Sequence, residues 1–216
     1  MYTSAMPLLN GEVKSGVTLH EIDSGIDTGN IIDKIIFEIE SEDTAKDLYI
    51  KYLYHSKSLL ERNLSNIISG NISSKPQSSI GSSYYSSKSI DYKNLKVNLN
   101  ATAKEIKNQI KAFTFPEYQV PKIHGYYVNF VEILNEKSVE KSGSLLKFEK
   151  TKIFISSLDY NMILYIDLNA ELFKSVTSNN MSKVLDCIEF GANINLRNGR
   201  GWTPLIIASY NGAVDL

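Results

Sequence analysis

One stretch of the chain carries an apolar pattern with the period of a helix, and the fold must accommodate it. From Thr44 to Ser69 the apolar side chains recur every three or four residues, so they fall on one face of a helix. Gly70 supplies a natural end, because glycine accepts the left-handed backbone of a helix C-cap. We therefore predict a helix over residues 44–69. Its apolar stripe consists of Ala45, Leu48, Tyr49, Tyr52, Leu53, Leu60, Leu64, Ile67 and Ile68.

The residues before this helix follow a strand–loop–strand pattern. Val17–Ile22 is rich in residues that favour strands, and Ile35, Phe37 and Ile39 alternate with polar residues, as in a half-buried strand. Between them, residues 23–30 read Asp-Ser-Gly-Ile-Asp-Thr-Gly-Asn, which is dense in turn formers. The pattern predicts two strands joined by a tight loop.

Residues 71–98 have no apolar period and are rich in serine. Two interpretations remain open for this segment, a surface loop or a ligand-binding loop. Long ordered loops in compact domains are often functional.

A second helix and a group of short strands follow. Thr102 and Glu105 form a capping box, in which each side chain satisfies the other's free backbone N–H. Pro116 ends the helix, because proline disfavours helix in the residue before it. The predicted buried face consists of Ala103, Ile106 and Ile110. Four strand-like runs then predict a small antiparallel unit: Tyr126–Leu134, Leu145–Glu149, Lys152–Ser157 and Met162–Leu168.

The last segment resembles ankyrin repeats. Residues 201–209 read Gly-Trp-Thr-Pro-Leu-Ile-Ile-Ala-Ser, close to the T-P-L-H-x-A helix start of that repeat of about 33 residues. Thr203 and Pro204 stand where the N-cap and the first helical residue belong. We predict one degenerate repeat and the front half of a second. Since a stable stack needs about three repeats, we expect this part to be truncated or to dock on the preceding domain.

Composition narrows the partners. The formal net charge is −1, and the chain lacks the basic surplus of proteins that bind nucleic acid through phosphates, so we expect no nucleic-acid partner. The one cysteine, Cys187, excludes an internal disulfide and a cysteine-based zinc cage, and the widely spaced histidines make a metal site improbable. No apolar run is long enough to cross a membrane, and the start has no signal-peptide pattern, so we expect a cytoplasmic protein without a membrane partner.

The strongest motif runs through the predicted loop. Residues 8–12 read Leu-Leu-Asn-Gly-Glu, and residues 16–29 follow the pattern G-V-T-x-H-x-x-D-x-G-x-D-T-G. This sequence resembles the formyltransferases that use N10-formyl-tetrahydrofolate, which include methionyl-tRNA formyltransferase and sugar N-formyltransferases. Lys111–Pro116 also stands where that family has an R-A-F-x-x-P-like stretch. The resemblance covers residues 1–170 approximately.

The resemblance implies a chemistry and a cofactor site. In the family an Asn, a His and an Asp surround the formyl carbon, and a neutral amine attacks it. Hydrogen-bond donors hold the tetrahedral oxyanion, the His acts as general base, and the Asp orients the His. Carried over by motif, that Asp is Asp27, and the implied folate-binding residues are Asp23, Gly25, Asp27 and Thr28. Apart from the resemblance, an Asx-turn or a cap in a tight loop is the simpler role for Asp27.

One part of the family pattern is not found in this sequence. The family's Asn and His lie in an N-x-H-x-S-L-L-P segment ahead of the L-L-N-G-E stretch, and Met1 falls between the two parts. We expect the chain as written to correspond to the C-terminal part of such an enzyme and to be inactive alone. His20, His55 and His124 are interpreted as structural histidines.

The resemblance also points to a substrate. A short, nearly neutral β unit followed by ankyrin repeats resembles the nucleotide-linked amino-sugar N-formyltransferases of surface-polysaccharide and O-antigen biosynthesis, which implies a dTDP-amino-deoxyhexose. Aromatic rings can stack on thymine, and a lysine can meet a pyrophosphate. Many such enzymes are homodimers through their β region. The implied sugar contacts are Gln77, Tyr84, Lys88, Phe113, Phe115 and Tyr118, although packing is the simpler role for the two phenylalanines and a solvated loop charge for the lysine.

The predicted architecture is α/β in three parts. Residues 1–117 form the C-terminal part of a formyltransferase-like Rossmann domain, residues 118–168 a small antiparallel β unit, and residues 169–216 ankyrin-type helices. Three alternatives stay open. The first is a methionyl-tRNA formyltransferase-like enzyme. The second is a binding module whose ankyrin part recognises a protein or a nucleotide through Trp202 and Tyr210. The third is an inactive gene remnant.

Overall fold

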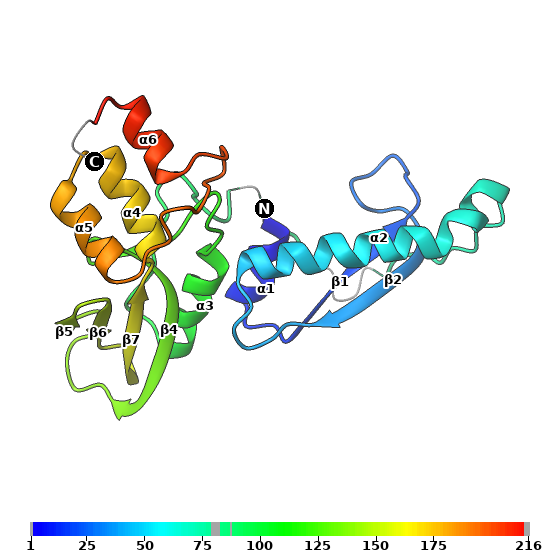
Figure 1. Ribbon diagram of the computed structural model, residues 1–216. Helices are drawn as coiled ribbons and strands as arrows, with labels where there is room; N and C mark the ends of the chain where they lie inside the picture. The colour runs from blue at the N-terminus through cyan, green and yellow to red at the C-terminus, as the bar shows by residue number, and fades with distance from the viewer. Residues whose placement is uncertain (1, 79–82, 87, 214–216) are drawn as a thin grey trace. The chain divides into compact units, whose positions relative to one another are not determined.

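The computed structural model describes residues 2–78, 83–86 and 88–213, and the chain divides into two compact units, Met1–Asp91 and Tyr92–Leu216 (Figure 1). The fold is mixed α/β, and every strand pair in the described residues is antiparallel. Within the described residues, no helix is both long and apolar enough to cross a membrane.

The first unit is a hairpin packed under a long helix. Its elements are α1 (Tyr2–Leu9), β1 (Lys14–His20), β2 (Ile31–Glu38) and α2 (Ala45–Ser69). β1 and β2 pair from Lys14↔Glu38 to His20↔Ile31, and α2 packs against both strands (Figure 1). The strand–loop–strand prediction is confirmed, but β1 ends at His20 and Ile22 lies in the loop, 97% exposed. α1 was not predicted, because it is short and contains Pro7.

The long helix begins and ends as predicted. Thr44 caps it in a reciprocal box with Asp47, and Gly70 closes it with φ 72°. The predicted buried stripe is only partly correct. Leu48 is fully buried, but Leu53 and Leu64 are 55% and 45% exposed, because the hairpin and α1 cover only part of the apolar face of the helix among the described residues.

Polar contacts fasten the hairpin to α2. The Asp33 carboxylate accepts hydrogen bonds from Asn63 Nδ2 at 2.7 Å and Arg62 Nε at 2.9 Å. Lys51 Nζ donates to Asp43 Oδ2 at 2.6 Å near the start of the helix. His55 on α2 stacks on Phe37 of β2, with ring centroids 4.7 Å apart, which is the structural role expected for it.

The second unit is built on a five-stranded antiparallel sheet in the order β3-β4-β7-β6-β5. The elements are α3 (Ala103–Phe113), β3 (Lys122–Ile123), β4 (Tyr126–Lys137), β5 (Leu145–Glu149), β6 (Lys152–Ile155) and β7 (Tyr160–Ile166). The predicted helix and its capping box are confirmed, and each of the four strand-like runs contains a strand, although Ser157 and Leu168 lie outside the strands and β3 was not predicted. Ile106 and Ile110 of α3 are fully buried in one core with the sheet. α3 therefore packs with the β unit, although the sequence grouped it with residues 1–117.

Three helices complete this unit: α4 (Leu168–Thr177), α5 (Met181–Glu189) and α6 (Pro204–Tyr210). Thr203 caps α6 and Pro204 is its first residue, as the repeat pattern predicts. The helices share a small core of Leu172, Val176, Val184, Cys187, Ile207 and Ala208. These helices occupy the segment that resembles ankyrin repeats.

Candidate functional site

The loop between β1 and β2 is held by its own polar groups. Asp23 Oδ1 accepts hydrogen bonds from the Gly25 N–H at 3.0 Å and from Thr28 Oγ1 at 2.6 Å. The hydrogen bond from Thr28 is the main cause that lowers the pKa of Asp23. The loop thus contains an Asx-type turn at Asp23, whereas the sequence offered such a turn for Asp27, and the four residues implied for folate binding lie within this loop.

Two glycines of the motif stand where a side chain would meet a close neighbour, backbone at Gly29 and a side chain at Gly25. A Cβ added at Gly29 would lie 1.8 Å from the Glu21 carbonyl oxygen, and one at Gly25 would lie 2.0 Å from Thr28 Oγ1. The Glu21 carbonyl oxygen belongs to the backbone, so it cannot move away by a side-chain rotation. The spacing of D-x-G-x-D-T-G is therefore a consequence of how tightly this loop closes.

Asp27 stands at the tip of the loop with φ 57°, and its side chain is 87% exposed. Its Oδ1 lies 3.7 Å from His20 Nε2. His20 Nδ1 lies 2.7 Å from the Glu21 carbonyl oxygen, which can only accept, so the proton is assigned to Nδ1. The sequence interpretation treated His20 as a strand residue, and its position in the same motif is the signal that links it to Asp27.

A cavity of about 680 Å³ opens beside Asp27 within the first unit. Asp27 and Tyr84, predicted separately as catalytic and sugar-binding, both line it. Tyr52 and Tyr85 also line it. Tyr52 OH lies 2.6 Å from Ser15 Oγ, and burial raises the Tyr52 pKa. Tyr85 OH accepts from Asn10 Nδ2 at 2.6 Å. Tyr52 gave no functional signal, since its place on the helical stripe is typical of packing.

The other sugar-contact candidates of this unit lie outside that lining. Gln77 Nε2 donates to the carbonyl oxygens of Asp27 at 2.8 Å and Gly29 at 2.6 Å. Lys88 is exposed, and its backbone N–H donates to Ser86 Oγ at 3.2 Å. Their assignment to the sugar stays a prediction.

The remaining candidates belong to the second unit. Phe113 and Phe115 are 7% and 6% exposed, so packing covers most of their ring surfaces. Tyr118 is 70% exposed, with its ring centroid 5.0 Å from that of Phe115. His124, in the turn before β4, contacts the Gly143 carbonyl oxygen through Nε2 at 3.0 Å, consistent with a structural role.

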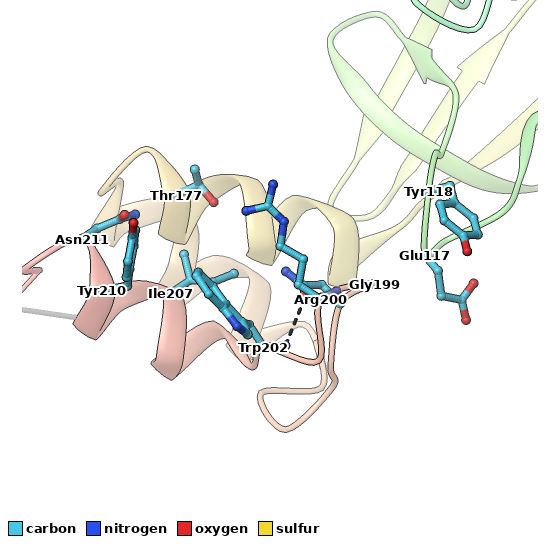
Figure 2. A pocket seen from close by; sticks show the side chains of 10 residues that line it. Glu117, Tyr118, Thr177, Gly199, Arg200, Trp202, Ile207, Tyr210 and Asn211 are labelled. Atoms are coloured by element: carbon cyan, nitrogen blue, oxygen red, sulfur yellow. Dashed lines mark hydrogen bonds between the residues drawn. The ribbon is translucent and has the colours of Figure 1, made fainter.

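Tyr118 lines a second cavity, of about 530 Å³, with residues of the ankyrin part. In Figure 2 the side chains of Arg200, Trp202 and Tyr210 come from the ankyrin part, and those of Tyr118 and Glu117 come from a separate segment. The centroids of the Trp202 and Tyr210 rings lie 5.1 Å apart. The cavity combines aromatic faces with a guanidinium group. Among the described residues, no group of three or more His, Cys, Asp or Glu side chains has the arrangement of a metal site.

Two protein families match the chain. The model of the formyl transferase family matches residues 2–64, and that of ankyrin repeats in many copies matches residues 172–216. These ranges hold the Asp27 loop and the three C-terminal helices.

Curated relatives include enzymes of two kinds. Methionyl-tRNA formyltransferase of Clostridium tetani is 29% identical over 174 residues, which is 76% of this chain and 54% of that protein. The bifunctional polymyxin resistance protein ArnA of Wigglesworthia glossinidia brevipalpis is 36% identical over 50% of this chain and 16% of its own length. The chain spans about half the length of the methionyl-tRNA formyltransferases it matches.

Among solved structures, two sugar N-formyltransferases match well. The N-formyltransferase of Helicobacter canadensis, in complex with folinic acid and dTDP-3-aminofucose, is 42% identical with a TM-score of 0.68, covering 77% of this chain and 61% of that one. WlaRD, a sugar 3N-formyltransferase studied with dTDP and 5-N-formyl-tetrahydrofolate, is 41% identical with a TM-score of 0.68 over 77% and 60%. Residues 2–64 of the chain are therefore similar to the formyl transferase family, and residues 172–216 are similar to ankyrin repeats.

Proposed function

We propose that this chain takes part in formyl transfer from N10-formyl-tetrahydrofolate to the amino group of a dTDP-linked amino sugar, in surface-polysaccharide biosynthesis. The observation that carries the proposal is the Asp27 loop, whose whole motif is present and whose carboxylate lines a cavity. Two sugar N-formyltransferases of known structure, bound to a folate together with dTDP or a dTDP-sugar, support it at 41–42% identity.

In this proposal Asp27 orients the general base that accepts the amine proton, which is a histidine in the family that the sequence resembles. A carboxylate beside an imidazole fixes its orientation and stabilises its protonated form. The Asp27 carboxylate lies 3.7 Å from His20 Nε2 and is 87% exposed, so it has room for a further imidazole, while the hydrogen bonds of Asp23 hold the loop closed. Folate would lie against Asp23, Gly25, Asp27 and Thr28, which lie together in this one loop.

Aromatic residues are the proposed contacts of the sugar nucleotide, and each unit is considered by itself. Tyr84 shares the cavity with Asp27 and is 87% exposed, so its ring is available for stacking. Lys88 lies in the same serine-rich segment as Tyr84, and its positive charge is suited to a pyrophosphate. Phe113, Phe115 and Tyr118 are proposed contacts in the second unit, with Tyr118 the most accessible of the three.

Calorimetric titrations of the 216-residue chain test this function. We expect it to bind folinic acid and a dTDP-linked 3-amino sugar, and Asp27→Asn to weaken folinic acid about tenfold or more, as expected for a lost charge-assisted hydrogen bond. Ser24→Ala, in the same loop, is the matched control and should bind as the original chain does. Absence of binding to both ligands, or equal affinity in Asp27→Asn, would contradict the proposal.

A methionyl-tRNA formyltransferase-like function is the second candidate, because curated enzymes of that kind match 76% of this chain in one case. A gel-shift titration with initiator tRNA separates the two. The net charge of −1 leads us to expect no shift at physiological salt. A specific tRNA complex would favour the second candidate.

The ankyrin part has a candidate function of its own, the binding of a protein or a nucleotide. The cavity of Trp202, Tyr210 and Arg200 favours a nucleotide, since these groups can stack on a base and pair with a phosphate. Trp202 is the chain's one tryptophan, so its fluorescence reports on this cavity. We expect dTDP to change that fluorescence, and Arg200→Ala to weaken the response. An unchanged emission at saturating dTDP would remove this candidate.

A further inference from the structure

A short segment far along the chain crosses the base of the Asp27 loop. Ile31 and Lys75 exchange two backbone hydrogen bonds, of 2.7 and 2.9 Å. One residue earlier, Ser74 Oγ donates to Glu21 Oε1 at 2.7 Å. Residues 74–77 therefore lie against both ends of the loop, which runs from Glu21 to Asn30.

Gln77 makes the contact nearest the loop's tip. Its amide carries two N–H donors, and two carbonyl oxygens lie within reach, those of Asp27 at 2.8 Å and Gly29 at 2.6 Å. These carbonyls stand on either side of Thr28. The backbone at Asp27 has φ 57°, a conformation uncommon for residues other than glycine. Such a conformation persists where the surroundings fix it, and Gln77 supplies that restraint from outside the loop.

We propose that Gln77 is a positioning residue, which holds the backbone on both sides of Thr28 and so aims the Asp27 carboxylate into the cavity. This inference rests on the proposed role of Asp27. It replaces the direct sugar contact expected for Gln77, because the donor group of its side chain is already committed to this chain's own backbone. Restraint from a second segment pre-organises a site without any contact to ligand.

A double-mutant cycle tests whether Gln77 acts through Asp27. Gln77→Ala should weaken folinic acid about tenfold, the order expected for one or two lost hydrogen bonds. In the Asp27→Asn background the same change should have little further effect, because no carboxylate remains to be aimed. Gln77→Glu keeps the side-chain shape but replaces the donors with a carboxylate facing two carbonyls, so we expect a larger loss than with alanine. Lys75→Ala is the control, since its backbone bonds to Ile31 remain.

Hydrogen exchange separates this inference from the proposed function. The Glu21 N–H bonds the Asn30 carbonyl at 2.9 Å and the Gly25 N–H bonds Asp23, so both amides report on the closed loop. Gln77→Ala should speed their exchange, with amides of β4 unchanged. If the original chain fails to bind folinic acid, the proposed function fails, and faster exchange at these amides still supports the restraint. Unchanged exchange, or additive effects of Gln77→Ala and Asp27→Asn on affinity, would overturn it.

Discussion

At the scale of single residues, the loop motif is explained by close approach of backbone atoms. Gly29→Ala would place a methyl group 1.8 Å from the Glu21 carbonyl oxygen. Since backbone must move, we expect the free energy of unfolding in urea to fall by roughly 1–3 kcal/mol, as for other overpacked sites. Ser24→Ala in the same loop is the control and should change it little. Equal stability of Gly29→Ala and the control would show that the loop is looser than described.

The motif predicted which residues share the loop, because its turn formers and glycines act locally. It could not predict what Gln77 contacts, since that side chain comes from a serine-rich segment without a period, and its partner Asp27 lies 50 residues earlier. The sequence also did not predict the contact between His20 and Asp27. Their 3.7 Å approach depends on how the hairpin closes, which no spacing rule specifies.

At the scale of elements, Asp33 links β2 to α2, and its pKa is lowered first by the hydrogen bond from Asn63 and then by Arg62. A carboxyl whose pKa is depressed on folding stabilises the fold above its ordinary pKa near 3.8, and this stabilisation is lost as the pH falls through the lower folded value. We therefore expect urea stability to decline below about pH 4, with a smaller decline in Asp33→Asn. Glu61→Gln, on the exposed Lys57 pair, is the control. If the stability of Asp33→Asn in urea declined below about pH 4 as much as that of the original chain, Asp33 would not be the group that stabilises the contact between β2 and α2.

Helices were predictable where caps and period agreed. The capping box of Thr102 and the helix end at Gly70 lie where the sequence placed them, and the helix predicted from Thr44 begins there with a capping box that was not predicted. The buried face of α2 was predicted less well, because the stripe shows which side is apolar and not how much of it this unit covers. Pro7 hid α1, since proline is usually a sign against a helix interior.

At the scale of the whole molecule, Cys187 reports whether the C-terminal helices are folded. Its side chain lies in their shared core at 6% exposure, and burial raises the pKa of its thiol. We expect a thiol reagent such as DTNB to react with the native chain far more slowly than with the chain in concentrated urea, where the thiol is exposed and ionises more readily. Equal rates would mean that these helices are unpacked, which would favour the gene-remnant interpretation.

Binding of folate at the Asp27 loop can be observed residue by residue in a two-dimensional ¹⁵N spectrum of the chain. Folinic acid is added to the labelled 216-residue chain, with Asp27→Asn as the matched variant. We predict that the largest shifts concentrate at residues 23–30 and at the Gln77 side-chain amide, and that they weaken in Asp27→Asn. Shifts confined to residues 168–213, or no shifts at saturating folinic acid, would contradict the account.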